Sequence, residues 1–210
     1  MKEKKKMINP NSLKISKQRI NKQRGHLLEE QVYQKIKTTL LPEGNNNYTN
    51  IWLKRQTHAS KKYTLKKAEI DNLFYYNNYL YIIQCKRKKG IHKGKKPVFW
   101  IFNNKLYLND QEVTEQYLQN LNHTSYYIKE HKIFILHGKP LIRKVLLLDA
   151  RLEENNKRIL FSIVRDTYVI TYNFLPTFLN LIKLNKLEKI ETTLKQKIEF
   201  HRKSRGGRVI

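Results

Sequence analysis

Acidic, amide and basic side chains recur at a short, regular spacing in two neighbouring segments of this sequence. Glu69 and Asp71 lie two residues apart, and so do Gln84 and Lys86 a short way further along. Residues two apart share one face of a β-strand. A carboxylate and an amide oxygen on such a face can hold a hard cation such as Mg²⁺, which lowers the pKa of a bound water. A lysine beside it can orient that water or take its proton. This is the chemistry of metal-assisted phosphodiester cleavage.

A β-hairpin would bring the two pairs together. The apolar and aromatic content predicts strands at Glu69–Tyr76 and Tyr79–Lys86. Asn77-Asn78 between them is suited to a tight turn, because Asn tolerates positive φ. Asp71 then lies close to Gln84 and Lys86, while Cys85 has the opposite phase and is expected in the core.

A helix precedes these strands. Leu28, Val32 and Ile36 recur every four residues and predict an amphipathic helix over residues 26–40. Glu29 lies on the polar border of the apolar stripe, where it could reach the edge of the sheet and complete the site. Its neighbour Glu30 remains open as an alternative.

The rest of the chain continues as a mixture of helices and strands. Further strands are predicted at Tyr48–Arg55, Ile133–Leu136, Lys144–Leu148 and Ile159–Val164, and further helices at residues 111–130 and over about 20 residues from Pro176. No element is predicted for the aromatic segment Val98–Leu108. The order predicts an α/β domain with a mixed central sheet over residues 25–174. A basic flexible arm (1–24) precedes it, and a C-terminal helix with a basic tail (175–210) follows.

Charge points to a polyanionic partner. The 210 residues carry 43 Lys and Arg against 17 Asp and Glu, a net charge of +26, and 40% of the chain is apolar. Such a body repels itself unless a polyanion accompanies it, so nucleic acid is the first partner to expect. The single Cys excludes a disulfide scaffold and a Cys-based zinc finger.

An anionic membrane is the rival polyanion. No apolar run reaches the roughly 18 residues that a spanning helix needs, and the basic start lacks the apolar stretch of a secretory signal. We therefore expect a cytoplasmic protein without a membrane partner. The sequence leaves the oligomeric state open, a homodimer included.

One basic segment directly follows the candidate site. Residues 86–96 carry seven Lys and Arg and no acid, and they could give salt-sensitive, sequence-independent contact with a nucleic-acid backbone. The alternative is an ordinary solvated loop. After Lys86, the expected contacts are Arg87, Lys88, Lys89, Lys93, Lys95 and Lys96.

These motifs resemble a known superfamily. Glu29, the E-I-D of residues 69–71 and the I-I-Q-C-K of residues 82–86, with Gly90 close behind, look like the PD-(D/E)xK nucleases. Within that superfamily the chain is most similar to the nuclease-related domain (NERD) family, over roughly residues 25–150. In that family an aliphatic residue follows the helix glutamate by three positions, and here Val32 follows Glu29.

Two later features extend the resemblance. Trp100 could supply the family's tryptophan-containing segment, and Gln119 and His123 match a Q-x-x-x-H helix that borders the site. The resemblance implies a restriction-endonuclease-like fold and a Mg²⁺- or Mn²⁺-dependent endodeoxyribonuclease, with DNA favoured over RNA. It implies that Asp71, Gln84 and Glu29 hold the metal and that Lys86 positions the water. Glu69, Gln119 and His123 would be supporting residues.

The chain departs from the family pattern at one position. Gln84 stands where the family has Glu, so the metal would be held with one charge less. A non-catalytic nucleic-acid-binding protein on the same fold therefore remains the alternative. The seven His residues show no HxH or HExxH spacing that would indicate a zinc site.

Overall fold

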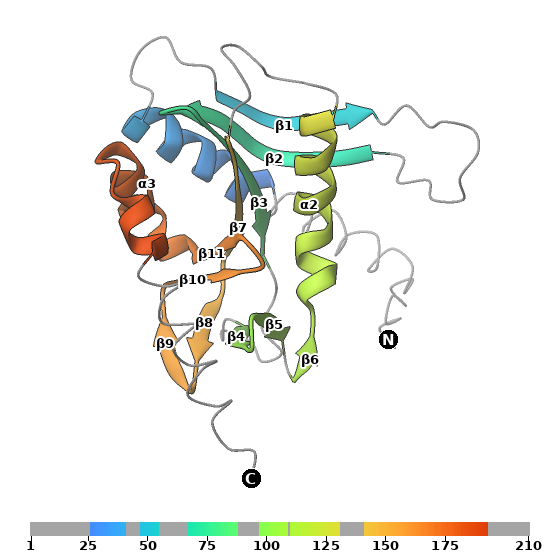
Figure 1. Cartoon of the computed structure of the whole chain (residues 1–210), viewed down its shortest axis with the longest axis vertical. Helices are drawn as coiled ribbons and strands as arrows, with labels where there is room; N and C mark the ends of the chain where they lie inside the picture. Colours follow the sequence, from blue (N-terminus) through green and yellow to red (C-terminus); the bar gives the residue numbers. More distant parts are fainter. Residues whose placement is uncertain are drawn as a thin grey trace, which may run out of the picture.

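The computed structural model describes most of the central part of the chain. The described residues are 26–40, 47–54, 67–87, 97–108, 110–130 and 141–192, with the backbone alone at 47–54, 67–69 and 130. They form a mixed α/β fold with two mixed sheets and helices (Figure 1). The predicted α/β class with a mixed central sheet is confirmed. The predicted strand Ile133–Leu136, the N-terminal arm and the basic tail lie outside the described residues.

A six-stranded sheet forms the centre of the fold, in the order β1-β2-β3-β7-β11-β10. β3 and β11 each pair with β7 in parallel, and the other neighbours are antiparallel. The parallel centre is buried, which explains the unbroken apolar run at the end of β7. The strands are β1 (Asn47–Lys54), β2 (Lys67–Tyr76), β3 (Tyr79–Lys86), β7 (Leu141–Leu148), β10 (Phe161–Val164) and β11 (Thr167–Thr171).

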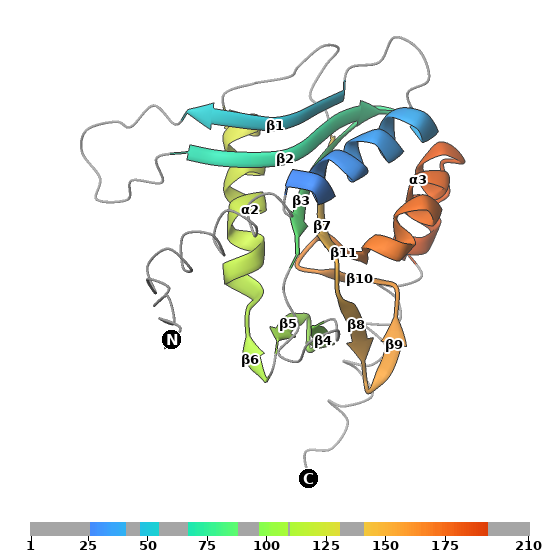
Figure 2. The same cartoon turned by 180° about the vertical axis from the view of Figure 1, so that it is seen from behind.

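Helices cover both faces of this sheet. The helix at residues 26–40 and α3 (Leu175–Lys183) pack on one face, and α2 (Thr114–Glu130) packs on the other (Figure 2). Side chains of β3 alternate between the two cores: Tyr81, Ile83 and Cys85 enter the first, and Leu80 and Ile82 enter the second. The predicted burial of Cys85 is confirmed.

A second, smaller sheet was not expected from the sequence. Its order is β6-β5-β4-β8-β9, and it lies beyond the lower end of the central strands in Figures 1 and 2. Its strands are β4 (Val98–Phe102), β5 (Lys105–Leu108), β6 (Gln111–Glu112), β8 (Arg151–Glu154) and β9 (Lys157–Ile159).

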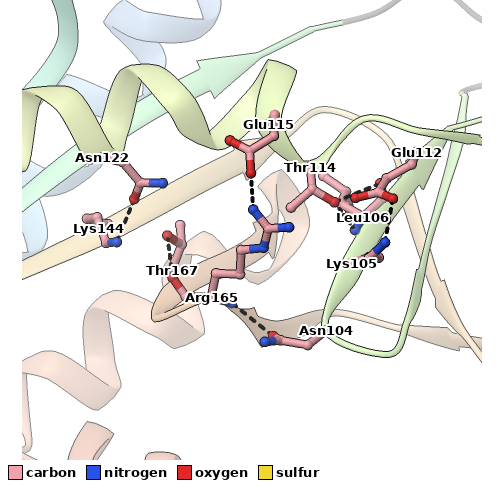
Figure 3. Close-up of polar contacts among 10 residues, drawn as sticks. All are labelled: Asn104, Lys105, Leu106, Glu112, Thr114, Glu115, Asn122, Lys144, Arg165 and Thr167. Carbon is pink, nitrogen blue, oxygen red and sulfur yellow. Dashed lines mark hydrogen bonds and ion pairs between the residues drawn. The ribbon is translucent and has the colours of Figure 1, made fainter.

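Polar contacts join the small sheet to the rest of the fold (Figure 3). The backbone N–H of Arg165 donates to Asn104 Oδ1 over 2.9 Å, and the Arg165 guanidinium pairs with Glu115 in the first turn of α2. In the same view Lys144 of β7 donates to Asn122 Oδ1 of α2 over 2.7 Å. These contacts join α2 to the central sheet, and the β10–β11 turn of that sheet to the β4–β5 turn of the small sheet.

Two-residue asparagine turns close three hairpins. Both residues have positive φ at Asn77-Asn78, Asn103-Asn104 and Asn155-Asn156, as tight hairpin turns require. The predicted hairpin between β2 and β3 is therefore confirmed, with Tyr76 opposite Tyr79. The same dipeptide closes the β4–β5 and β8–β9 hairpins of the small sheet.

The C-terminal elements differ from the prediction. α3 starts one residue before Pro176 but ends at Lys183, because Asn185 takes a positive φ of 53°, and a second short helix follows at residues 187–192. The single strand expected at Ile159–Val164 is interrupted at Leu160 and contributes to both sheets. Within the described residues, no helix is long and apolar enough to cross a membrane.

Arg143 of β7 fastens the helix at residues 187–192 to the sheet. Its guanidinium lies 3.5 Å from the centre of the Tyr79 ring and donates to the Tyr81 hydroxyl over 2.9 Å. It also forms ion pairs with Glu188 at 3.3 Å and Glu191 at 3.8 Å. The buried cation is therefore both paired with carboxylates and stacked on an aromatic ring, as a buried charge requires.

Candidate functional site

Asp71 lies where β2 and β3 separate. Their ladder ends at the pair Asn72–Ile83, while β2 remains paired with β1 as far as Lys67. Beyond the ladder the Asp71 side chain makes the connection, since its Oδ2 accepts from the backbone N–H of Cys85 over 2.6 Å. Asp71 is 2% exposed. A carboxylate is therefore buried at the point where the sheet opens, a position that requires polar partners.

Gln84 is a side-chain partner of Asp71. Its Nε2 donates to Asp71 Oδ2 over 2.7 Å, and its Oε1 accepts from Asn120 Nδ2 of α2 over 2.6 Å. Gln84 is itself buried, at 4% exposure. The three side chains thus form a continuous hydrogen-bonded chain from α2 to β2.

Glu29 approaches the same region from the other face of the sheet. Asn72, next to Asp71, donates from Nδ2 to the backbone carbonyl of Glu29 over 3.2 Å. The Glu29 side chain is only 12% exposed and lies 3.1 Å from His26 Nδ1. Glu30 is exposed and accepts from Gln34 over 2.8 Å. Of the two glutamates, Glu29 is the one held against the sheet.

The pKa of the Cys85 thiol responds to the charges of this region. Burial raises the pKa of Cys85 well above its ordinary value, and the negative charges of Asp71 and Glu29 raise it further. The positive charge of Lys86 lowers it. Lys86 is partly exposed at the end of β3. Asp71 and Gln84 are therefore joined directly, whereas Glu29 contacts this region through its backbone carbonyl and Lys86 follows Cys85 at the end of β3.

The expected supporting residues do not all reach this group. Gln119 and His123 are exposed on α2, and the contact with Gln84 comes from Asn120, the neighbour of Gln119. The backbone of Glu69 lies opposite Trp52 of β1, and the Glu69 side chain is outside the described part of the structure.

Of the expected nucleic-acid contacts, only Arg87 lies among the described residues. It is exposed, and its Nε lies 3.1 Å from Asp149 Oδ2. The backbone N–H of Asp149 donates to the Lys86 carbonyl over 3.0 Å, which joins the ends of β7 and β3. Outside the described residues lie Lys88, Lys89, Lys93, Lys95 and Lys96.

Three residues of this region were not identified from the sequence: Asn72, Asn120 and Asp149. Asn72 lies between Asp71 and the apolar and aromatic end of β2, where a buried amide has to find partners. Asp149 directly follows the buried run of β7, and parallel neighbours such as β3 and β7 end at the same edge of a sheet. Asn72 and Asp149 could therefore have been identified from the sequence. The contact of Asn120 could not, because it depends on how α2 is rotated about its axis.

The donor set suits a hard cation. Asp71 and Glu29 supply carboxylate oxygens, and Asn72 Oδ1 is a buried amide oxygen for which the structure shows no hydrogen-bond partner. Such an orphaned oxygen calls for water or a cation. The described residues hold no group of three His, Cys, Asp or Glu side chains that could bind a metal. A cation here would therefore need amide oxygens as well as carboxylates.

Comparison with known proteins gives no relative for this chain. No family model, no curated protein and no solved structure matches it. The resemblance to the nuclease-related domain family therefore stays a prediction, and the side chains of the site are the basis for the function proposed below.

Proposed function

We propose that the protein is a metal-dependent nuclease acting on DNA, with a restriction-endonuclease-like fold. The observation that carries the proposal is the position of Asp71. Its buried carboxylate lies where β2 leaves β3, with Gln84 bonded to it, while the neighbouring Asn72 holds the backbone of Glu29 and Lys86 ends β3. Apart from the inserted strands β4, β5 and β6 of the small sheet, the order of helix, three strands, helix and parallel strand is compatible with the fold that the sequence resemblance implies.

Asp71 and Glu29 would hold the metal, together with an amide oxygen of Gln84 or Asn72. When bound, Mg²⁺ supplies positive charge to the phosphate and lowers the pKa of a water. Gln84 Oε1 accepts from Asn120, so Gln84 would offer its oxygen to a cation beside Asp71 only after both amides turn over. The Cys85 N–H keeps the Asp71 carboxylate in place throughout.

Lys86 and Arg87 would act on the substrate. Lys86, at the end of β3, would orient the attacking water and stabilise its deprotonated form. The Arg87 guanidinium is held by Asp149 at 3.1 Å and carries planar donors that suit a phosphate oxygen. The net charge of +26 adds sequence-independent attraction for the DNA backbone.

Cleavage of a supercoiled plasmid by the full-length protein tests the proposal. We expect cutting in Mg²⁺ or Mn²⁺ that EDTA abolishes. Asp71→Asn and Lys86→Ala should each lower the rate by about 100-fold or more. Glu29→Gln should lower it by about tenfold, while its matched control Glu30→Gln should cut at the wild-type rate. Lys157→Ala, at an exposed lysine of β9, controls for the loss of one positive charge.

Two results would overturn the assignment. One is equal cutting by wild type, Asp71→Asn and Lys86→Ala. The other is equal loss in Glu29→Gln and Glu30→Gln, which would show that the position of Glu29 against the sheet has no bearing on the activity. Circular dichroism and thermal melts establish that each variant is folded.

A second candidate function is nucleic-acid binding without cleavage. The observation in its favour is that Gln84 satisfies Asp71 with a neutral donor over 2.7 Å, while Asn120 satisfies Gln84. The hydrogen-bonded series Asp71–Gln84–Asn120 thus forms without a cation. Binding of DNA in both Mg²⁺ and Mn²⁺ with no cutting, and with the same affinity in Asp71→Asn, would establish this function in place of the first.

A further inference from the structure

Three aromatic rings gather on the outer face of the small sheet. Trp100 of β4 stacks on Tyr107 of β5, with ring centres 4.2 Å apart and planes 13° from parallel. Phe102 lies beside them, 6.4 Å from Trp100, and is 40% exposed. We call these three residues the aromatic platform.

The platform is separate from the apolar core. Along β4 and β5 the buried and partly exposed positions alternate. Phe99, Ile101, Leu106 and Leu108 are buried in the core shared with α2. The platform residues have the opposite phase, so their rings lie on the outer face. The core under this sheet is therefore already formed without them, and the stacked rings remain accessible.

Basic side chains flank the aromatic platform. Arg151 pairs with Val98 at one end of the outer face, and Arg158 lies beyond Glu153, the residue opposite Trp100. Both arginines are exposed. The acids of this face have basic neighbours, since Glu153 is opposite Arg158 and Glu112 pairs with Lys105 at 2.8 Å. Flat rings bordered by guanidinium groups suit bases that are joined by phosphates.

The small sheet is also continuous with the candidate site. β8 begins two residues after Asp149, and the backbone N–H of Arg151 donates to the Pro97 carbonyl over 2.9 Å. Glu153, the neighbour of Trp100, is four residues from Asp149, at most about 14 Å along an extended chain. A strand bound near Arg87 could therefore reach the rings within a few nucleotides.

We propose that the aromatic platform binds unpaired bases of a single-stranded segment of DNA, by stacking on Trp100 and Tyr107. The proposal rests on the proposed function for its partner, and it adds that single-stranded or frayed DNA is preferred. Stacking does not discriminate strongly among bases, because every base has a flat face. The preference is therefore for strand state and not for sequence.

Fluorescence titration tests the platform directly. The chain has two tryptophans, Trp52 and Trp100, so Trp52→Phe leaves Trp100 as the only one. Oligo-dT added to this variant, with EDTA present to prevent cleavage, should quench Trp100. A duplex of equal length should quench it far less.

Affinity measurements separate this inference from the proposed function. Trp100→Ala should weaken oligo-dT binding by about tenfold, and Trp100→Phe, which keeps a ring, should recover most of it. Tyr126→Ala removes an exposed ring of α2 and should change nothing. If folded Trp100→Ala binds oligo-dT like wild type, the platform is wrong and the nuclease proposal stands. If wild type binds neither oligo-dT nor duplex, both proposals fail.

Discussion

The side-chain amide of Gln84 donates a hydrogen bond to the carboxylate of Asp71 over 2.7 Å. The pair joins β2 to β3 beyond the last backbone pair of their ladder. A neutral donor stabilises the buried charge without adding a second charge that would need compensation. This single contact determines how the site responds to substitution and to metal.

Gln84→Glu should destabilise the metal-free protein and make its stability depend on Mg²⁺. Two carboxylates would face each other in a buried position, so we expect the free energy of unfolding in EDTA to fall by about 3 kcal/mol. Mg²⁺ should restore part of this loss, because it can bridge the two carboxylates. Urea unfolding with and without Mg²⁺ measures both effects. Gln119→Glu, at an exposed position of α2, is the matched control. No recovery in Mg²⁺ would show that Asp71 and residue 84 do not share a cation.

Asn120→Ala should destabilise the protein more than Gln119→Ala. The first leaves Gln84 Oε1 buried without its donor, a loss of about 1–2 kcal/mol. The second truncates an exposed side chain and should stay within about 0.5 kcal/mol. Chemical denaturation of the two variants is the measurement. The reverse order would mean that Asn120 does not support Gln84 in solution.

Cys85 should resist thiol reagents in the folded protein. Burial and the charges of Asp71 and Glu29 raise its pKa, so the reactive thiolate is scarce at neutral pH. It is the single cysteine of the chain, which makes a thiol assay unambiguous. We expect no reaction under native conditions and one equivalent in guanidinium. Rapid native modification would place Cys85 outside the core.

Stability should fall in strongly alkaline solution. Burial raises the pKa of Tyr81 and of Tyr168, whose hydroxyl also bonds Glu191. A phenol with a raised folded pKa stabilises the native state fully below its unfolded pKa, about 10, and loses that contribution as the pH rises above it. The free energy of unfolding should therefore decrease between about pH 10 and about pH 11.

Tyr168→Phe is the variant that checks this pH dependence. It removes one of the two phenols, so its stability should fall less steeply over the same alkaline range than that of wild type. Lys144 has the opposite effect on the free energy of unfolding. Burial lowers its folded pKa, so its contribution to stability increases as the pH rises toward its unfolded pKa. An equal alkaline slope in wild type and Tyr168→Phe would contradict the prediction.

Elements with strong local signals could be predicted well from the sequence. The helix at residues 26–40 and strand β3 have the predicted bounds. A repeated apolar spacing specifies the helix locally, and the asparagine turn before β3 specifies where that strand begins. β11 was missed, since the turn before it has Arg165 as well as Asp166 at positive φ, and arginine is not a residue type that marks a tight hairpin.

The small sheet could not be predicted for a different reason. Its strands are two to five residues long, too short for periodicity to distinguish them from loops. They are stabilised by packing under α2 and by pairing between β4 and β8, segments about fifty residues apart in the sequence. Such distant pairing has no local signature.

In the candidate site, too, local patterns predict some contacts, while others depend on how the elements pack. Strand alternation predicts that Asp71 and Gln84 share a face, and they are hydrogen-bonded. The choice of Asn120 over Gln119 as their partner depends on the rotation of α2 by one residue. The family pattern pointed to Gln119 and His123, which are exposed, and no local feature of α2 distinguishes Asn120.

The side chains of β3 alternate between the two cores of the fold, and the strand is paired with both β2 and β7. An inserted or deleted residue within it would exchange the two sides, placing a thiol toward α2 and an amide in the apolar layer. Point substitutions can accumulate along this strand without such a change. Over evolutionary time, the length of the segment between Asn78 and Arg87 should thus vary less than its composition.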